Sequence, residues 1–229
     1  MSEVKRPETL ETGDEWLRGR GRLIVVSSPS GGGKGTLIRR VLKEVSGLGY
    51  SVSYTTREAR PGEVHGRHYF FVTPETFMEM VRSGEFLEWA SVHGNLYGTA
   101  RSQVERELAE GRDILLEIDV QGAESVRAQV EKAVSVFILP PSFETLSARL
   151  TARGSERPDD LTLRLKNARS EVERYVEFDY VVINDEVERA ARQLAAIIQA
   201  DRARRERQEY RARRVLATFR PADPEEGKG

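Results

Sequence analysis

Residues 23–42 read LIVVSSPSGGGKGTLIRRVL, and this stretch decides the fold. Leu23 to Val26 form a short β-branched apolar run, which is typical of a buried parallel strand. From Lys34 onward the apolar residues fall on one face of a predicted helix, and they are Leu37, Ile38, Val41, Leu42 and Val45. The glycine-rich segment therefore lies in a turn between a strand and a helix.

The turn is similar to the phosphate-loop motif G-x-x-x-x-G-K-[ST], with Gly33 and Lys34 in register. Glycines let consecutive backbone N–H groups face phosphate oxygens, the helix N-terminus adds partial positive charge, and Lys34 supplies a full one. The motif predicts binding of a nucleoside triphosphate, which GTPases, ATPases and small kinases share. The predicted contacts are Ser28, Pro29, Ser30, Gly31, Gly32, Gly33, Lys34, Gly35 and Thr36.

Two positions depart from this motif. Ser28 replaces the first glycine, and Gly35 replaces the serine or threonine whose hydroxyl usually touches Mg²⁺. No residue is therefore assigned as a direct metal ligand. We expect the nucleotide phosphates to hold Mg²⁺, with Thr36 or Asp119 contacting it through water.

The composition is that of a globular chain, with 38% apolar and 32% charged residues among 229. The 36 basic and 37 acidic side chains nearly cancel, which supports neither stable nucleic-acid binding nor a membrane surface. Cysteine is absent, which excludes disulfides and thiolate chemistry, and three histidines make a histidine-built metal site improbable. With no signal-peptide pattern in the sequence, we expect a cytoplasmic protein.

Further apolar runs alternate with helical segments at Ile114 to Ile118, Val134 to Leu139 and Tyr180 to Ile183. This alternation predicts an α/β fold, a parallel sheet with helices on both faces. Aromatic and glycine-broken runs predict a small mixed-β insertion, and an arginine-loaded helical pattern predicts a lid. The expected parts are an N-terminal arm (1–20), a core (21–50, 101–141 and 179–199), the β insertion (51–100), the lid (142–178) and a charged extension (200–229).

The last core helix is expected to begin at Asp185, a favourable N-cap with Glu188 three residues later. Beyond it, the arginine-rich segment 202–214 raises the alternative of nucleic-acid binding. Acidic residues are interleaved with the arginines, so a solvated helical extension is the preferred interpretation.

Residues 55–72 read TTREARPGEVHGRHYFFV and suggest a site for a phosphate group. Arg57 and Arg60 can fork onto one phosphate, and the hydroxyls of Tyr69 and Tyr97 can donate to it. Taken singly, each of these residues could equally be a surface charge or a core aromatic. Together and in this order they favour a clamp for a dianion.

The same segment resembles the signature of the guanylate kinase family, through Thr55, Thr56, Arg57, Arg60, Glu63, Gly66, Tyr69 and Phe71. The resemblance runs from about residue 21 to 198 and includes EFLEWA, GNLYGT, EIDVQG, LPPS and VIND. It implies a P-loop kinase that transfers a phosphoryl group from ATP to GMP with Mg²⁺. It also implies a core with an NMP-binding insertion and a lid.

The resemblance assigns roles to individual residues. Glu88 matches the carboxylate that reads guanine, whose N1–H and N2–H donors adenine lacks, so AMP should be rejected. Glu117 and Asp119 follow a buried strand as Walker-B-like carboxylates would, and either order Mg²⁺ through water or hold the acceptor. The implied GMP contacts are Ser53, Arg57, Arg60, Glu63, Tyr69, Glu88, Tyr97, Thr99, Glu117 and Asp119. Asn184 is implied beside the adenine of ATP, and the implied catalytic residues are Lys34, Arg149, Arg153 and Arg164.

Three other interpretations remain to be weighed. A non-catalytic guanylate-kinase-like scaffold module would usually lack the phosphate loop, an adenylate kinase would lack the 55–72 signature, and a GTPase would carry N-K-x-D. The lid arginines could instead belong to an exposed, salt-bridged helix. The sequence leaves the oligomeric state open between monomer and homodimer.

Overall fold

The computed structural model describes residues 21–92, 94–152 and 158–219. Five strands form a central sheet in the order β2-β7-β1-β8-β9, and every neighbouring pair is parallel. This confirms the expected α/β fold. The strands are β1 (Leu23–Ser27), β2 (Leu48–Tyr50), β7 (Asp113–Glu117), β8 (Val134–Leu139) and β9 (Tyr180–Ile183).

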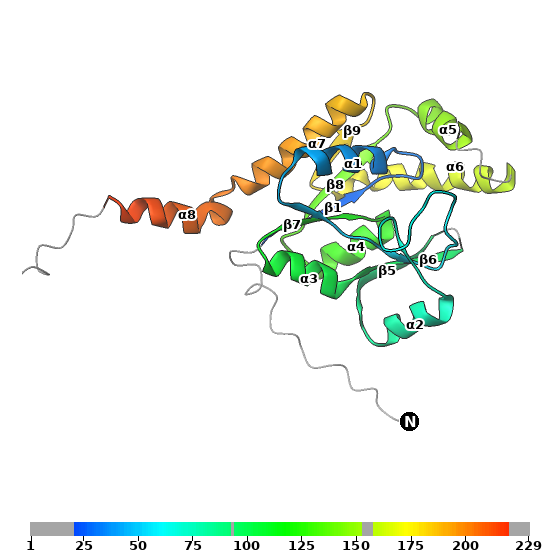
Figure 1. Ribbon diagram of the computed structural model, residues 1–229. Helices are drawn as coiled ribbons and strands as arrows, with labels where there is room; N and C mark the ends of the chain where they lie inside the picture. The colour runs from blue at the N-terminus through cyan, green and yellow to red at the C-terminus, as the bar shows by residue number, and fades with distance from the viewer. Residues whose placement is uncertain (1–20, 93, 153–157, 220–229) are drawn as a thin grey trace, which may run out of the picture.

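Helices cover both faces of this sheet (Figure 1). On one face, Ile24 and Val26 of β1 pack in a cluster with the apolar sides of α1 and α7. On the other face, Leu23 and Val25 join a second cluster with α3 and α4. Strand β1 is fully buried because alternate side chains enter two different clusters, which explains its uninterrupted apolar sequence. The helices are α1 (Lys34–Glu44), α3 (Arg101–Ala109), α4 (Val120–Gln129) and α7 (Val187–Arg202).

A second, four-stranded sheet in the order β4-β3-β6-β5 lies beside the core. It combines one parallel pair with two antiparallel pairs, and helix α2 (Pro74–Arg82) covers it through Phe77. Its aromatic content explains its formation, because short strands need packed side chains to be stable. The strands are β3 (Tyr54–Thr55), β4 (Phe70–Phe71), β5 (Phe86–Val92) and β6 (Asn95–Ala100).

Two helices, α5 (Phe143–Ala152) and α6 (Pro158–Glu173), follow β8, and the one-turn 3₁₀ helix η1 (Arg174–Glu177) leads into β9. Leu146 and Leu150 of α5 are buried against Ala168 of α6. These three side chains form a cluster separate from the two core clusters. The helical pair therefore has apolar contacts of its own.

The expected start of the last core helix is wrong by two residues. Helix α7 begins at Val187 after Glu186, and no side chain caps it. Asp185 instead accepts a hydrogen bond from the Glu186 backbone N–H at 2.6 Å and pairs with Arg189. The aspartate therefore stabilises the turn before the helix. In the sequence alone, an aspartate in such a turn cannot be distinguished from an aspartate that caps the helix.

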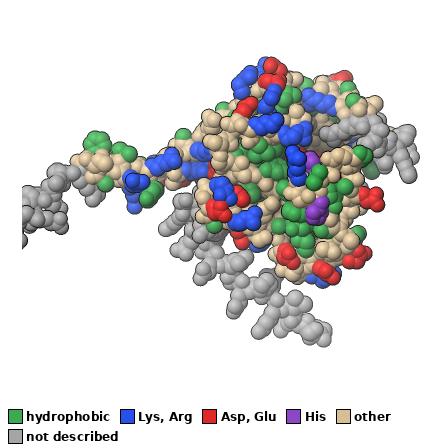
Figure 2. Space-filling model, in the orientation of Figure 1, with side chains coloured by type: hydrophobic (Ala, Val, Ile, Leu, Met, Phe, Trp, Pro, Cys, Tyr) green, Lys and Arg blue, Asp and Glu red, His purple; other side chains and the backbone are tan. Residues whose placement is uncertain are grey.

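Beyond α7, helix α8 (Arg205–Ala217) projects from the body (Figure 1). Figure 2 shows hydrophobic and basic side chains along this projection. Arg207 of α8 reaches back to the core and bonds Asp113 and Asp201, both at 2.5 Å. Arg22 donates to the same two carboxylates, from its backbone N–H to Asp113 and from Nε to Asp201. None of the described helices is both long and apolar enough to cross a bilayer.

Candidate active site

The phosphate loop lies between the end of β1 and the start of α1 and depends on glycine at two left-handed positions. Gly31 has φ 85° and Gly33 has φ 87°, values that residues with a Cβ rarely adopt. Space is also restricted, because a Cβ on Gly33 would lie 2.3 Å from Nδ2 of Asn184. The Gly32 backbone N–H donates to the Pro29 carbonyl at 2.9 Å, which closes the turn.

Two side chains hold this loop from outside. Asn184, at the end of β9, is 2% exposed and donates from Nδ2 to the Gly32 carbonyl at 2.8 Å. Arg149 of α5 donates to the Gly32 carbonyl at 3.4 Å and to the Asn184 carbonyl at 3.0 Å. Because the Gly32 carbonyl is hydrogen-bonded to these side chains, it points away from the inside of the loop, where backbone N–H groups can face a ligand. The structure thus brings Arg149 and Asn184 together at the phosphate loop.

Lys34, the first residue of α1, extends across the loop. Its ammonium donates to the Ile118 carbonyl, just beyond the end of β7, at 2.8 Å. The backbone N–H of Ser30 donates to the carboxylate of Glu171, from α6, at 2.9 Å. Both ends of the loop therefore make polar contacts to neighbouring elements. Thr36 is exposed, and its hydroxyl accepts a hydrogen bond from Arg39 at 3.3 Å.

Glu117 at the end of β7 faces Gly35. A Cβ on Gly35 would lie 3.3 Å from Oε1 of Glu117, so the missing side chain leaves a small space beside a carboxylate. The other oxygen of Glu117 accepts a hydrogen bond from Tyr50 at 3.2 Å. Burial and the charge of Glu117 raise the pKa of the Tyr50 hydroxyl well above its usual value. The same two causes raise the pKa of Tyr69 to about 12. Glu117 therefore lies between the phosphate loop and the tyrosines.

Asp119 occupies a different position, although it is only two residues away. It is the N-cap of α4, and its Oδ1 accepts from the Gly122 backbone N–H at 2.9 Å. Its Oδ2 accepts from Gln121 at 3.2 Å. Both carboxylate oxygens thus take part in the first turn of α4. The expected pair of carboxylates is divided between the phosphate loop and this helix.

The arginine predicted to bind phosphate is held by a carboxylate. Arg57 donates from both terminal nitrogens to the two oxygens of Glu63, each at 2.9 Å, and lies over the ring of Tyr69. Burial would lower the Arg57 pKa, but the hydrogen bonds to Glu63 and Tyr97 raise it. Burial alone would raise the pKa of Glu63. The pKa is nevertheless lowered, because the carboxylate accepts hydrogen bonds from Arg57 and from the Arg60 backbone N–H. Arg57 is therefore charged and fixed in orientation.

Glu88 is turned into the site by a β-bulge. In the pairing of β5 with β6, Phe86 lies opposite Ala100 and Glu88 opposite Thr99, so Leu87 is an extra residue. As a result, Phe86 stacks on Phe77 of α2, with ring centroids 4.5 Å apart, while Glu88 points to the opposite face. The Thr99 hydroxyl donates to Glu88 Oε1 at 2.6 Å. Thr99 and Glu88 are both buried.

The pKa of Glu88 is raised to about 7, chiefly by burial and further by the nearby charge of Asp119. The hydrogen bond from Thr99 opposes this rise because it favours the ionised form. A buried carboxylate with a pKa near neutrality is typical of a functional site.

The remaining predicted residues lie on the small sheet, in the loop beside it and on α6. Tyr97 lies on β6 opposite Thr55, with its ring centroid 6.0 Å from that of Tyr69. Ser53 precedes β3, and Arg60 is exposed in the loop after it. Arg164 lies partly buried on α6. Arg153 lies outside the described residues, so its predicted catalytic role is not placed.

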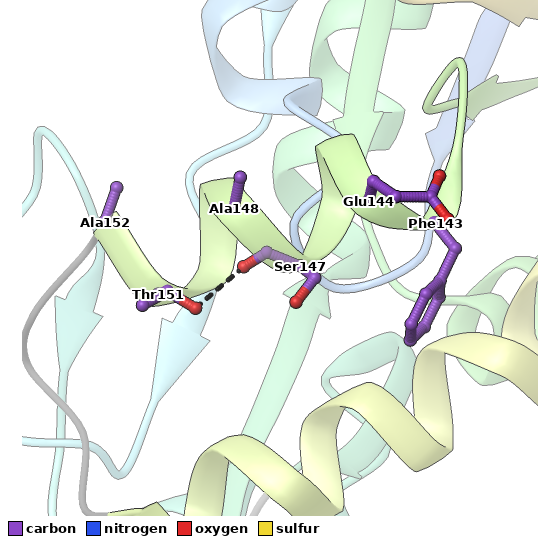
Figure 3. Close-up of a pocket in the computed structure, with 6 residues that line it drawn as sticks. All are labelled: Phe143, Glu144, Ser147, Ala148, Thr151 and Ala152. Carbon is purple, nitrogen blue, oxygen red and sulfur yellow. Dashed lines mark hydrogen bonds between the residues drawn. The ribbon is translucent and has the colours of Figure 1, made fainter.

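A hollow of about 710 Å³ lies along α5, and no residue of the phosphate loop lines it (Figure 3). All six residues that line it, from Phe143 to Ala152, come from this one helix. Most of them lie on the other side of α5 from Leu146 and Arg149, whereas the ring of Phe143 turns toward α6, where Arg169 lies over it. The hollow is therefore a groove along a single helix.

Three contributors were not predicted from the sequence. Tyr50 and Glu171 bond to residues of the site from 67 and 141 positions away, and no local pattern indicates such contacts. Gly122 lies in EIDVQG, and a Cβ there would come within 2.5 Å of Glu88 Oε2. Only the glycine's place inside an otherwise regular helix could have singled it out.

Known proteins resemble this chain over most of its length. The model of the guanylate kinase family matches residues 20–201. A guanylate kinase of Dechloromonas aromatica is 52% identical over 180 residues, which are 79% of this chain and 89% of the relative. A guanylate kinase of Thermotoga maritima is 46% identical over 185 residues, 81% and 89% of the two chains. The crystal structure of guanylate kinase from Anaplasma phagocytophilum aligns with a TM-score of 0.73 at 35% identity, covering 90% of this chain and 99% of that one.

Proposed function

The chain belongs to the guanylate kinase family and transfers the γ-phosphoryl group of ATP to GMP, and we propose that its residues divide this work among three parts. These are the phosphate loop, the acceptor wall formed by the small sheet, and the lid. The observation that carries the proposal is the position of Glu117, which faces Gly35 of the loop on one side and bonds Tyr50 on the other. Glu117 would thus lie at the boundary between the ATP site and the GMP site. Two sites that adjoin in this way suit a direct transfer between the two nucleotides.

The phosphate loop would bind the β- and γ-phosphates of ATP. Backbone N–H groups are offered by Gly31, Gly33, Lys34 and Gly35, and the N-terminus of α1 adds partial positive charge. Lys34 would leave the Ile118 carbonyl for a phosphate oxygen, since a phosphate offers the ammonium a full charge. Asn184, whose amide is committed to Gly32, supports the loop, and its implied place beside adenine stays a prediction.

The lid would supply the remaining positive charge. A guanidinium carries five N–H donors, so the two bonds that Arg149 makes to carbonyls are compatible with a further contact to phosphate. We assign Arg153 and Arg164 the same role in the closed lid. Charge placed around the moving phosphoryl group accounts for most of the catalysis of such a transfer, and closure excludes water.

The acceptor wall would bind GMP at two points. Arg57, held by Glu63 and backed by Tyr69, would meet the GMP phosphate together with Arg60 and the Tyr97 hydroxyl. Glu88 would accept the N1–H and N2–H donors of guanine, with Ser53 and Thr99 adding hydroxyl contacts. The phosphate of GMP is already an anionic nucleophile, so no protein base is needed.

The residues near Gly35 fit a magnesium ion bound through ATP. Among the described residues no group of three or more His, Cys, Asp or Glu side chains could hold a metal ion by itself. The space that a Cβ would fill on Gly35 lies 3.3 Å from Glu117, which suits a water molecule between the carboxylate and the ion. When bound, Mg²⁺ neutralises charge on the β- and γ-phosphates. Glu117, and not the α4-capping Asp119, is therefore the better candidate for the indirect contact.

A coupled assay with ATP and GMP, dGMP, AMP or UMP tests the assignments when it is applied to variants. For Lys34→Ala we expect a large fall in kcat, on the order of 10² or more, because transition-state charge is lost. The matched control is Lys43→Ala, an exposed lysine in the last turn of the same helix. Near-normal turnover of Lys34→Ala would remove the lysine from its proposed role.

ATP and GMP are metabolites of the cytoplasm, and we propose that the chain acts there. The choice between monomer and homodimer can be made by light scattering.

A further inference from the structure

The contact between Glu88 and Gly122 joins the small sheet to the core. Glu88 lies on β5, and Gly122 lies in the first turn of α4. A Cβ on Gly122 would stand 2.5 Å from Oε2 and 3.1 Å from Cδ of Glu88. Contacts below 3.0 Å essentially never occur for a real Cβ, so even an alanine would force a displacement.

The backbone does not require glycine at this position. Gly122 is helical and is not among the glycines with positive φ. Its backbone N–H already donates to Asp119, a bond that any residue other than proline would make. Because glycine inside a helix is less favourable than alanine, the sequence accepts a local penalty here. The Glu88 carboxylate explains this choice, because it is the closest group to the absent Cβ.

Glu88 has little freedom to move elsewhere. Its side chain is 6% exposed, Oε1 is bonded to Thr99, and Oε2 lies against the Gly122 backbone. The bulge at Leu87 fixes the strand on which Glu88 is carried. A side chain at position 122 would therefore displace the Glu88 carboxylate or break its bond to Thr99.

We propose that Gly122 is a specificity-determining positioning residue: its missing side chain lets the Glu88 carboxylate rest on α4 in the orientation that pairs with both guanine donors. This inference rests on the proposed role of Glu88 in reading guanine. Gly122 itself touches neither the base nor the reacting phosphates.

The test compares Gly122→Ala, Glu88→Ala and the double variant, with steady-state kinetics for GMP, IMP and ATP. IMP keeps N1–H but lacks the N2 amino group, so it reports on the second of the two guanine bonds. For Gly122→Ala we expect KM for GMP to rise about 10- to 100-fold, since a displacement of about 1 Å in a positioned group has effects of this size. The preference for GMP over IMP should fall, while KM for ATP stays within about twofold because the phosphate loop is not touched.

Thermal unfolding separates positioning from simple structural damage. Gly122→Ala should lower Tm in the native background, where it collides with Glu88. In the Glu88→Ala background the same change should leave Tm unchanged or raise it, because alanine is the better helix residue. Such a reversal of sign requires the two residues to be coupled.

Three results would overturn the inference. In the first, Gly122→Ala leaves KM for GMP and the GMP/IMP preference unchanged, whereas Glu88→Ala raises that KM and abolishes the preference. This result would remove the role of Gly122 and keep that of Glu88. An equal loss of Tm in both backgrounds would make the glycine merely structural. Unchanged selectivity in Glu88→Ala would refute the proposed role of Glu88, and the inference would fall with it.

Discussion

The side-chain amide of Asn184 donates to the Gly32 carbonyl at 2.8 Å, although the two residues are 152 positions apart. Asn184 directly follows the edge strand β9, and Gly32 is the centre of the phosphate loop. A Cβ on Gly33 would stand 2.3 Å from the same amide nitrogen. Any larger residue at position 33 would therefore collide with Asn184. The far edge of the sheet thus helps to set the geometry of the loop.

For Asn184→Ala we expect KM for ATP to rise about tenfold or more, with KM for GMP little changed. The Gly32 carbonyl would lose a buried donor, which also costs about 1–3 kcal/mol of stability. Steady-state kinetics and urea unfolding measure the two effects. Asp185→Ala, at the exposed neighbouring position, is the control and should leave both nucleotides' KM values unchanged. Equal effects on ATP and GMP would contradict a role centred on the phosphate loop.

For Glu117→Gln we expect a higher Mg²⁺ concentration at half-maximal activity, by about tenfold, because an amide attracts a metal-bound water less than a carboxylate does. Calorimetric titration of ATP, with and without Mg²⁺, measures the same loss without turnover. Asp119→Asn is the comparison, and it should affect α4 stability more than Mg²⁺ dependence, since Asp119 caps that helix. A larger change in Mg²⁺ dependence in Asp119→Asn than in Glu117→Gln would assign the indirect contact with Mg²⁺ to Asp119 in place of Glu117.

The raised pKa of Glu88, about 7, predicts that GMP binding weakens in acid. Guanine's two donors require the ionised carboxylate, so KM for GMP should rise below pH 7 and approach about a tenfold increase per pH unit. KM for ATP provides the internal control over the same range. In Thr99→Val the rise should begin at higher pH, because the hydrogen bond that lowers the Glu88 pKa is lost. A flat profile for GMP between pH 6 and 8 would be inconsistent with this carboxylate as the reader.

The same pKa has a consequence for stability with a definite sign. The folded state holds a proton on Glu88 up to about pH 7, whereas the unfolded chain releases it near pH 4.5, the usual pKa of a glutamate. Between these values the folded state binds more protons, so the contribution of Glu88 to stability falls as pH rises.

For Arg207→Ala we expect a loss of stability with unchanged kcat and KM. Arg207 bonds the buried carboxylates of Asp113 and Asp201, at the end of the sheet opposite the phosphate loop. The loss should stay below the ~3–5 kcal/mol of an unpaired buried charge, because Arg202 and Arg22 still hold Asp113. Arg205→Ala, whose side chain is 89% exposed, is the control for chemical unfolding. Equal stability of the two variants would show that α8 does not brace the core.

Much of the fold follows from short-range pattern. Strands such as Val134–Leu139 were predicted to the residue because parallel strands buried on both faces read as continuous apolar runs. The phosphate loop was likewise predictable, since glycines at 31 and 33 are required by left-handed backbone. Local pattern gives the wrong helix start at Asp185, because this residue type favours the N-cap position but here lies before the actual N-cap of α7.

The site was harder to predict because its geometry depends on contacts between distant segments. In a regular strand Phe86 and Glu88 would share a face, and only the bulge at Leu87 separates them. Similarly, the sequence does not indicate that Glu63 pairs with Arg57, whereas its expected contact to GMP stays a prediction. The resemblance to a family indicated which residues matter, whereas the bonds that orient them come from the three-dimensional arrangement.

The ion pair between Arg22 and Asp201 joins residues 179 positions apart, just before the first core strand and near the end of the last core helix. The catalytic body thus begins and finishes at one place, on the side away from the phosphate loop. A short peptide there would suffice to join the two ends, and the chain could then be opened at a surface turn without moving any catalytic side chain. The body is therefore well suited to circular permutation, or to insertion as a unit within another protein.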